Sequence, residues 1–259
     1  MSYTQYLISN DIANDASKET TIIPATPGIT QTWQKPAGVT YLIVECWGAG
    51  GAGGYVNANN SGGSGGGGGA YSKKTFSNLS PDSYNISFQI GAPGSSSLTP
   101  SPFSNAGGDT WFISNTSTGC LAKGGSAGLQ NNGASVLGGQ AASGFGDITF
   151  SGGSSGQGVG STRSGGGGGG AGSTGAGGNA STTAITAGIG TTIGGGDGGA
   201  GSTTSTIGLS GNPYGGGGGG AYGTTGGNRD RAGGVGAAGA IQVAYYINTT
   251  TFIDLEGDD

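Results

Sequence analysis

Three uninterrupted glycine runs constrain this chain more than any other sequence feature. They cover residues 65–69, 165–170 and 215–220, and an alanine follows each run directly. Polyglycine can form an extended helix with three residues per turn and a rise of ~3.1 Å per residue, with no hydrogen bonds inside one segment. Its N–H and C=O groups point sideways, so neighbouring segments must satisfy them. We therefore predict that the runs pack side by side as polyglycine II helices.

The predicted structural glycines are those of the three runs: Gly65, Gly66, Gly67, Gly68, Gly69, Gly165, Gly166, Gly167, Gly168, Gly169, Gly170, Gly215, Gly216, Gly217, Gly218, Gly219 and Gly220.

A glycine content of 66 in 259 residues also invites a prediction of disorder. Three tryptophans, ten tyrosines and seven phenylalanines argue against it, because a solvated linker would not carry them. Collagen is excluded because the glycines follow no strict third-residue period and only eight prolines are present. An ordered, glycine-dependent architecture is the remaining interpretation.

Short runs of β-branched and aromatic residues predict the strands. The clearest alternation places Tyr84, Ile86, Phe88 and Ile90 on one face of a half-buried strand. The predicted fold is all-β, with a short antiparallel β-sandwich portion, a packed bundle of polyglycine II helices and loops, and essentially no α-helix. The expected strands cover residues 41–47, 70–76, 83–90, 110–114, 120–122 and 240–246.

Composition shifts divide the chain into four parts. Residues 1–32 form an N-terminal arm or attachment segment, which could be an edge strand or a flexible tail. Residues 33–123 form a β-rich portion that holds the first glycine run, and residues 124–239 form the polyglycine-helix bundle. Residues 240–259 comprise the closing strand and an acidic tail, which is either solvated or an assembly peptide.

The sequence offers little for catalysis. It has no histidine, so a Ser-His-Asp triad is impossible. A pair of carboxylates among Asp147, Asp197 and Asp230 is an alternative, although each is more simply a turn residue that bonds its own backbone. No Gly-x-x-x-x-Gly-Lys-Ser/Thr phosphate loop is present. We predict no catalytic, cofactor-binding or metal-binding residues, and hence no enzyme and no cofactor.

Charge and targeting signals limit the partners. The net charge of −5 argues against nucleic acid and anionic membranes. No apolar stretch approaches the ~18 residues of a membrane helix, and no secretory signal is visible, so we expect synthesis in the cytosol without membrane insertion. Cys46 and Cys120 are then more simply free thiols than a bridge, with Cys46 a small buried residue on the same strand face as Leu42 and Val44.

Several short motifs occur in a fixed order along the chain. They are Trp33 to Gly38, residues 41–47 entering Gly48-Ala49-Gly50-Gly51, Gly-Gly-Ala-Tyr71, Ile90-Gly91, Gly107-Gly108-Asp109-Thr110, Ala122-Lys123-Gly124-Gly125 and the strand at 240–246. This order resembles a glycine-rich domain family, whose members occur in phage tail-fibre and adhesin proteins, in surface proteins of large DNA viruses, and in the extracellular region of the anaplastic lymphoma kinase type of receptor. The resemblance implies a β-sandwich-like portion fused to polyglycine helices, with recognition loops at one end.

A receptor ectodomain would need a signal peptide, a membrane span and more cysteine, so the viral branch fits this sequence better. We therefore expect a virion surface or fibre protein that assembles in the host cell. Its partners would be other virion proteins or copies of itself, and a host cell-surface receptor. Loops at residues 55–60, 98–103, 130–132 and 212–214 are the candidate recognition sites, although their aromatic residues are more simply turn-packing residues. The candidate residues are Tyr55, Asn59, Phe103, Asn131 and Tyr214.

Two alternatives stay open from the sequence. One is a non-viral structural glycine-rich protein. The other is an ice-binding protein, since the threonine-rich stretches at residues 182–186 and 203–206 could form a flat hydroxyl and methyl face.

Overall fold

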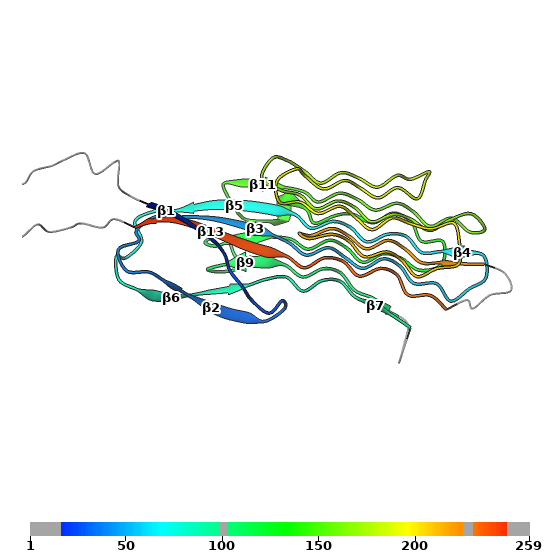
Figure 1. Ribbon diagram of the computed structural model, residues 1–259, viewed down its shortest axis with the longest axis horizontal. Coiled ribbons are helices and arrows are strands. Elements are labelled where there is room, and N and C mark those ends of the chain that lie inside the picture. Colours follow the sequence, from blue (N-terminus) through cyan, green and yellow to red (C-terminus); the bar gives the residue numbers. More distant parts are fainter. Residues whose placement is uncertain (1–16, 99–102, 225–229, 248–259) are drawn as a thin grey trace, which may run out of the picture.

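Two antiparallel sheets pack as layers in the computed structural model, which describes residues 17–98, 103–224 and 230–247 (Figure 1). The five-stranded sheet has the order β1-β13-β3-β5-β11, and the four-stranded sheet has the order β10-β9-β6-β2. Two further sheets have two strands each, β12-β4 and β7-β8. The fold is all-β, and the one helical element among the described residues is a single turn of 3₁₀ helix, η2 (Ala141–Ser143).

The strands are β1 (Ser17–Ile22), β2 (Thr30–Lys35), β3 (Leu42–Trp47), β4 (Ser61–Gly62), β5 (Tyr71–Phe76), β6 (Tyr84–Gln89), β7 (Ser96–Ser97), β8 (Phe103–Ser104), β9 (Thr110–Phe112), β10 (Cys120–Ala122), β11 (Ile148–Phe150), β12 (Tyr222–Gly223) and β13 (Ala240–Ile247).

The sandwich core forms where the apolar faces of the two sheets meet. Residues of β3 alternate between buried and half-buried, so that Leu42 and Val44 face the second sheet. Ile86 and Phe88 of β6 face them from the other side, as their alternation predicted. Tyr84, which starts the same strand, remains 36% exposed. Each fully buried side chain of this kind contributes about 1.5–3 kcal/mol, and these contacts hold the two layers together.

Both described ends of the chain lie at the same end of the sandwich. β1 pairs with β13, and Ser17 is directly opposite Ile247. β13 begins at Ala240, next to the glycine-rich part, and runs away from it (Figure 1). β1 is thus an edge strand within the predicted arm, and β2 crosses the boundary placed at residue 33.

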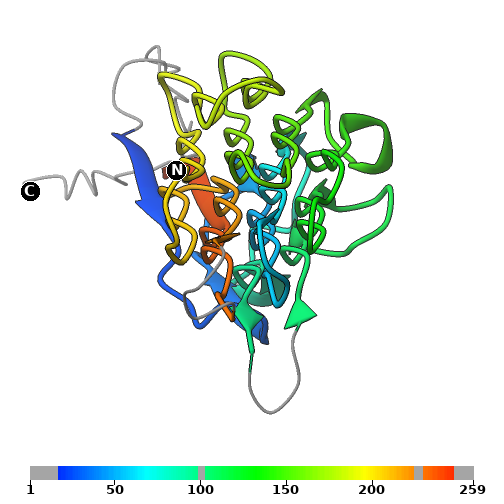
Figure 2. The same ribbon diagram turned by 90° about the vertical axis from the view of Figure 1, so that its right-hand side faces the viewer.

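Beyond the sheets, extended glycine-rich segments run side by side. We refer to the described residues 48–70, 91–98, 103–109, 123–140, 152–224 and 230–239 as the glycine bundle. Figure 2 views it end-on, so that the segments run toward and away from the viewer. The residues of the three glycine runs are all buried. Gly215 alone among them has a left-handed backbone, with φ of 76°, where the third run begins.

The hydrogen bonds of the bundle repeat every third residue. Among residues 48–54, the amides of 48, 51 and 54 donate to residues 64–70, those of 49 and 52 to residues 105–108, and those of 50 and 53 to residues 234–237. The N···O distances are 2.7–3.1 Å. A backbone that turns by one third per residue directs successive amides to three neighbours, which is the pattern expected for polyglycine II helices.

The segment at residues 63–70 is surrounded on all sides. Its amides donate to residues 215–221, 123–129 and 153–156, again with a period of three. Its carbonyls accept from residues 48–54, from residues 165–171 and from Gly139. Six neighbouring segments therefore provide the hydrogen-bond partners of one central helix. A Cβ atom added to any of its glycines would clash with the backbone of a neighbouring segment.

Candidate recognition site

Seven turns of the bundle meet at the end opposite to the sandwich. We call them the distal turns: residues 55–62, 95–98 with 103–104, 130–135, 157–163, 181–186, 202–206, and 222–224 with 230–231. Backbone hydrogen bonds join them, for example Asn132 N to Gly62 O and Ser161 N to Asn60 O. β4 and β7 mark this end in Figure 1. The threefold lattice thus positions segments that are far apart in the sequence on one surface.

Asparagine amides connect two of these turns. Asn131 Nδ2 donates to Asn57 Oδ1 at 2.6 Å, and Asn131 Oδ1 accepts from the backbone N–H of Asn57 at 3.2 Å. Asn132 Oδ1 accepts from the Gly62 amide at 3.1 Å. Asn131 and Asn132 also have left-handed backbones, with φ of 43° and 64°. Asparagine tolerates this conformation better than most residues, which explains the residue type at both positions.

Arg163 joins two distal turns, 157–163 and 181–186, through its side chain. The side chain is 7% exposed and directs its guanidinium at backbone carbonyls. Nη1 donates to Gln157 O at 2.9 Å, and Nη2 donates to Thr182 O at 2.5 Å. Nη1 also lies 3.5 Å from Ala184 O. The sequence analysis missed this residue, although it carried a signal: Arg163 is the one cation between Lys123 and Arg229, and it lies two residues before a glycine run.

Four of the five candidate recognition residues lie in the distal turns. Asn59 is exposed, Phe103 of β8 is 37% exposed, and Tyr55 and Asn131 are half-buried. The candidate loop at residues 98–103 lies partly outside the described residues. The described charged residues of the distal turns are Arg163, Asp230 and Arg231. The surface therefore offers mainly amides, hydroxyls and aromatic rings.

Tyr214 lies at the other end of the bundle. Its ring packs against Trp47, the last residue of β3, with ring centroids 5.8 Å apart. Trp47 also contacts Tyr71 at 5.4 Å, and Tyr71 stacks on Phe150 at 6.2 Å. These four aromatic residues form a second core where the five-stranded sheet enters the bundle. Tyr214 is a packing residue of this junction.

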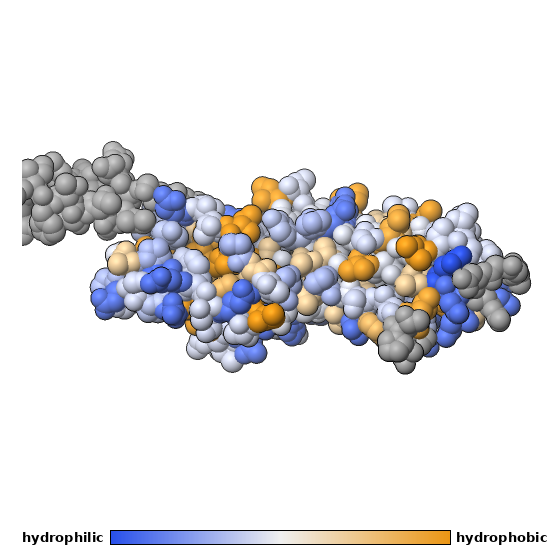
Figure 3. Space-filling view, turned by 60° about the horizontal axis from the view of Figure 1, so that its bottom comes forward, coloured by the Kyte–Doolittle hydropathy of each residue, from blue (hydrophilic) through white to orange (hydrophobic). Residues whose placement is uncertain are grey.

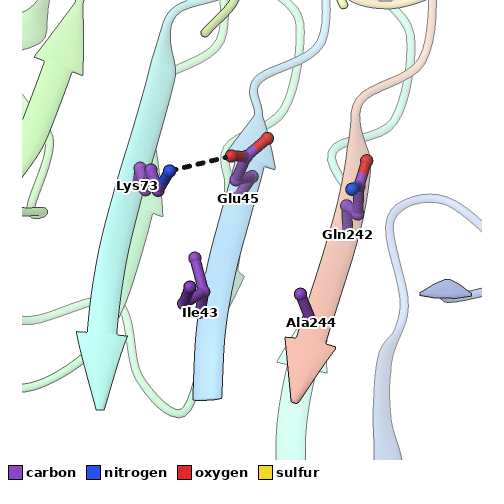
Figure 4. Close-up of a pocket in the computed structure, with 5 residues that line it drawn as sticks. All are labelled: Ile43, Glu45, Lys73, Gln242 and Ala244. Carbon is purple, nitrogen blue, oxygen red and sulfur yellow. Dashed lines mark ion pairs between the residues drawn. The ribbon is translucent and has the colours of Figure 1, made fainter. Parts of the chain in front are cut away.

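A shallow pocket lies on the outer face of the five-stranded sheet. Figure 4 shows its lining, which comprises Ile43 and Glu45 of β3, Lys73 of β5, and Gln242 and Ala244 of β13. The volume is about 60 Å³, and Lys73 Nζ lies 3.4 Å from Glu45 Oε1. This space holds at most a few waters and is far smaller than a typical small-molecule site.

The three aspartates considered for catalysis lie in different parts of the molecule. Asp147 accepts a hydrogen bond from the Thr75 amide beside the sandwich, at 2.7 Å. Asp197 accepts one from the Gly190 amide, also at 2.7 Å, and Asp230 is exposed in a distal turn. Two of them bond backbone amides, but these amides lie 72 and seven positions away in the sequence and not in the aspartate's own turn, as a turn residue would require. Within the described ranges, no group of three or more His, Cys, Asp or Glu residues could hold a metal ion.

The surface carries its exposed aliphatic residues in separate groups. On the face drawn in Figure 3, apolar patches alternate with hydrophilic and neutral ones. Among the largest exposures are Ile189 at 73% and Ile207 at 62%. Both threonine-rich stretches, 182–186 and 203–206, lie within distal turns. None of the helices among the described residues has the length and apolar character needed to cross a membrane.

Comparison with known proteins relates the chain to a protein family. Residues 25–246 match the family model described as a glycine-rich domain. The matched stretch begins between β1 and β2 and ends within β13, so it includes the whole bundle and most of the sandwich. No curated protein matches the chain.

Proposed function

The chain belongs to the glycine-rich domain family, and from this premise we propose that it is a non-catalytic protein of a virion surface or fibre that binds a host receptor through its distal turns. The sandwich end would attach it to other virion proteins or to copies of itself. The motif order that resembles phage fibre and large DNA virus surface proteins supports the viral assignment.

The observation that carries this proposal is that the described chain ends and the distal turns lie at opposite ends of the molecule. Ser17 and Ile247, the described ends of the chain, are paired at one end of the sandwich. The distal turns lie at the other end of the bundle (Figure 1). A protein that is anchored by its termini would present the distal turns outward. Loops on a rigid scaffold are the usual place for recognition residues.

The lattice itself supports a recognition role for the turns. The buried segments require glycine because their neighbours are backbone atoms. The distal turns escape this constraint, since their side chains reach solvent at Asn59 and Phe103. Substitutions there can change a binding surface without disturbing the packing. We expect aromatic and amide side chains of this surface to supply the binding energy.

The location is tested by antibody labelling of intact assemblies that contain the chain, imaged by electron microscopy. Label on the exterior is the expected result. Label that appears only after the assemblies are opened would place the chain inside a shell or tube and contradict the proposal.

The recognition role is tested by competition. Excess purified chain should block attachment of the assemblies to host cells, and Asn59→Ala with Phe103→Ala should weaken this block by about tenfold or more. Tyr84→Ala is the matched control, because Tyr84 is 36% exposed on a sandwich strand. Equal effects of the distal and control variants would contradict recognition by the distal turns.

A further inference from the structure

Two thiols face each other across the sandwich core. Cys46 lies on β3 of the five-stranded sheet, and Cys120 lies on β10 of the four-stranded sheet. Both side chains are completely buried, and both are free. They are the chain's two cysteines, so the only intrachain bridge available would join the two layers.

The strands approach each other closely at this point. Cys46 Sγ lies 3.8 Å from Cys120 O, and Cys120 Sγ lies 3.9 Å from Val44 O, two residues before Cys46. Cys120 Sγ is also 3.5 Å from the carbonyl oxygen of Ser72, which pairs directly with Cys46. Each sulfur therefore lies against the backbone that carries the other.

We propose that Cys46 and Cys120 are a disulfide site, and that a disulfide oxidant such as oxidised glutathione joins them as the chain folds. One cysteine thiolate attacks the oxidant, forming a mixed disulfide and releasing one glutathione thiolate. The second cysteine thiolate then attacks the mixed disulfide, forming the Cys46–Cys120 bond and releasing the second glutathione. The two cysteines lose two protons and two electrons, and the oxidant's disulfide is reduced.

The folded core slows this reaction. Burial, followed by the neighbouring Cys120 side chain, raises the pKa of the Cys46 thiol well above its ordinary value. The reactive thiolate is therefore scarce, and the oxidant cannot reach a buried sulfur. We expect the bond to form before the two sheets close and, once formed, to resist reduction in the folded protein.

The bond would close a long loop. The cysteines are 74 positions apart, and β5, β6 and β9 lie between them. A cross-link of this length restricts the unfolded chain strongly, so we expect the melting temperature to rise by about 10 °C. This inference stands independently of the proposed function, because it concerns only the sandwich core.

The test refolds the full, reduced and denatured chain with a mixture of reduced and oxidised glutathione, and in parallel with reductant alone. Thiols are counted after denaturation, and melting is followed by circular dichroism. We expect the glutathione sample to lose both thiols, to remain monomeric on a non-reducing gel, and to melt about 10 °C higher until it is reduced. Cys46→Ala and Cys120→Ala should each abolish the rise.

A second route gives the same readout if refolding yields are low. The chain is expressed in bacteria with an oxidising cytosol and in bacteria with a reducing one, and its thiols are counted again. Two free thiols after the oxidising route would overturn the inference. So would disulfide-linked dimers, or a bridged monomer that melts no higher than the reduced chain.

Discussion

A Cβ atom added to Gly68 would lie 2.0 Å from the carbonyl oxygen of Gly169. The two residues belong to different glycine runs that are about a hundred positions apart in the sequence. The Gly68 amide donates to Gly153 O at 2.9 Å, so the same residue is held by a third segment. Absence of a side chain is therefore what allows these segments to approach closely enough for hydrogen bonding.

Gly68→Ala should destabilise the protein by about 3 kcal/mol or more, because the added methyl group meets backbone that cannot move aside. Gly38→Ala is the matched control. Its φ of 79° makes alanine strained by about 1–2 kcal/mol, but nothing lies within 4 Å of the added atom. Urea unfolding measures both. If both variants lost the same free energy of unfolding, close packing of the bundle would be contradicted.

Arg163→Met should destabilise the distal turns by roughly 2 kcal/mol, because it removes charge-assisted hydrogen bonds from a buried guanidinium to partly buried carbonyls. In this variant, amide hydrogen exchange at residues 182–186 should become faster. Lys73→Met is the control, since its ion pair with Glu45 is partly exposed and contributes at most about 1 kcal/mol. Unchanged exchange at residues 182–186 would show that the guanidinium does not fix that turn.

Tyr71→Phe should change the response of stability to alkaline pH. Burial, with the nearby Glu45 carboxylate, raises the pKa of Tyr71 well above its ordinary value of 10.0. The unfolded chain then loses this proton first, so stability should fall as pH rises above 10. In the phenylalanine variant we expect a smaller loss of stability between pH 8 and pH 11. The free energy of unfolding, measured at both pH values, tests this. The variant should lose little stability at pH 8, because the Tyr71 hydroxyl has no hydrogen-bond partner in the described part of the chain.

Tyr214→Ala and Phe103→Ala should separate packing from recognition. Tyr214 packs on Trp47, so its loss should cost roughly 2 kcal/mol of stability. Phe103 is 37% exposed in β8, so its loss should cost well under 1 kcal/mol. Thermal unfolding distinguishes the two variants. If Phe103→Ala lost more stability than Tyr214→Ala, the assignment of Tyr214 to the junction would be wrong.

Much of the fold could be predicted from residue type alone. The alternation of Ile86 and Phe88 identified a half-buried strand, and the apolar run at residues 240–246 identified the closing strand, which spans Ala240–Ile247. The glycine runs predicted a hydrogen-bonded bundle because their backbone groups had no other partners. These features depend on local chemistry, which the sequence displays directly.

Positions that depend on which segments become neighbours could not be predicted. Successive glycines are chemically identical, so nothing in them specifies that Gly51 pairs with Gly67. For the same reason the sequence could not show that residues 212–214 return to Trp47, or that residues 55–60 meet residues 130–132. The edge strand β1 was one of several interpretations of the arm, since a single strand's pairing partner is not encoded locally.

Amide hydrogen exchange of the three glycine runs in the intact protein tests the threefold lattice most directly. We expect slow exchange for nearly all amides at residues 65–69, 165–170 and 215–220, with protection close to that of β3 and β13. Segments that are extended but not bonded to their neighbours would exchange at the rate of an unstructured chain. That result, with the sandwich strands still protected, would contradict the threefold hydrogen-bonded lattice.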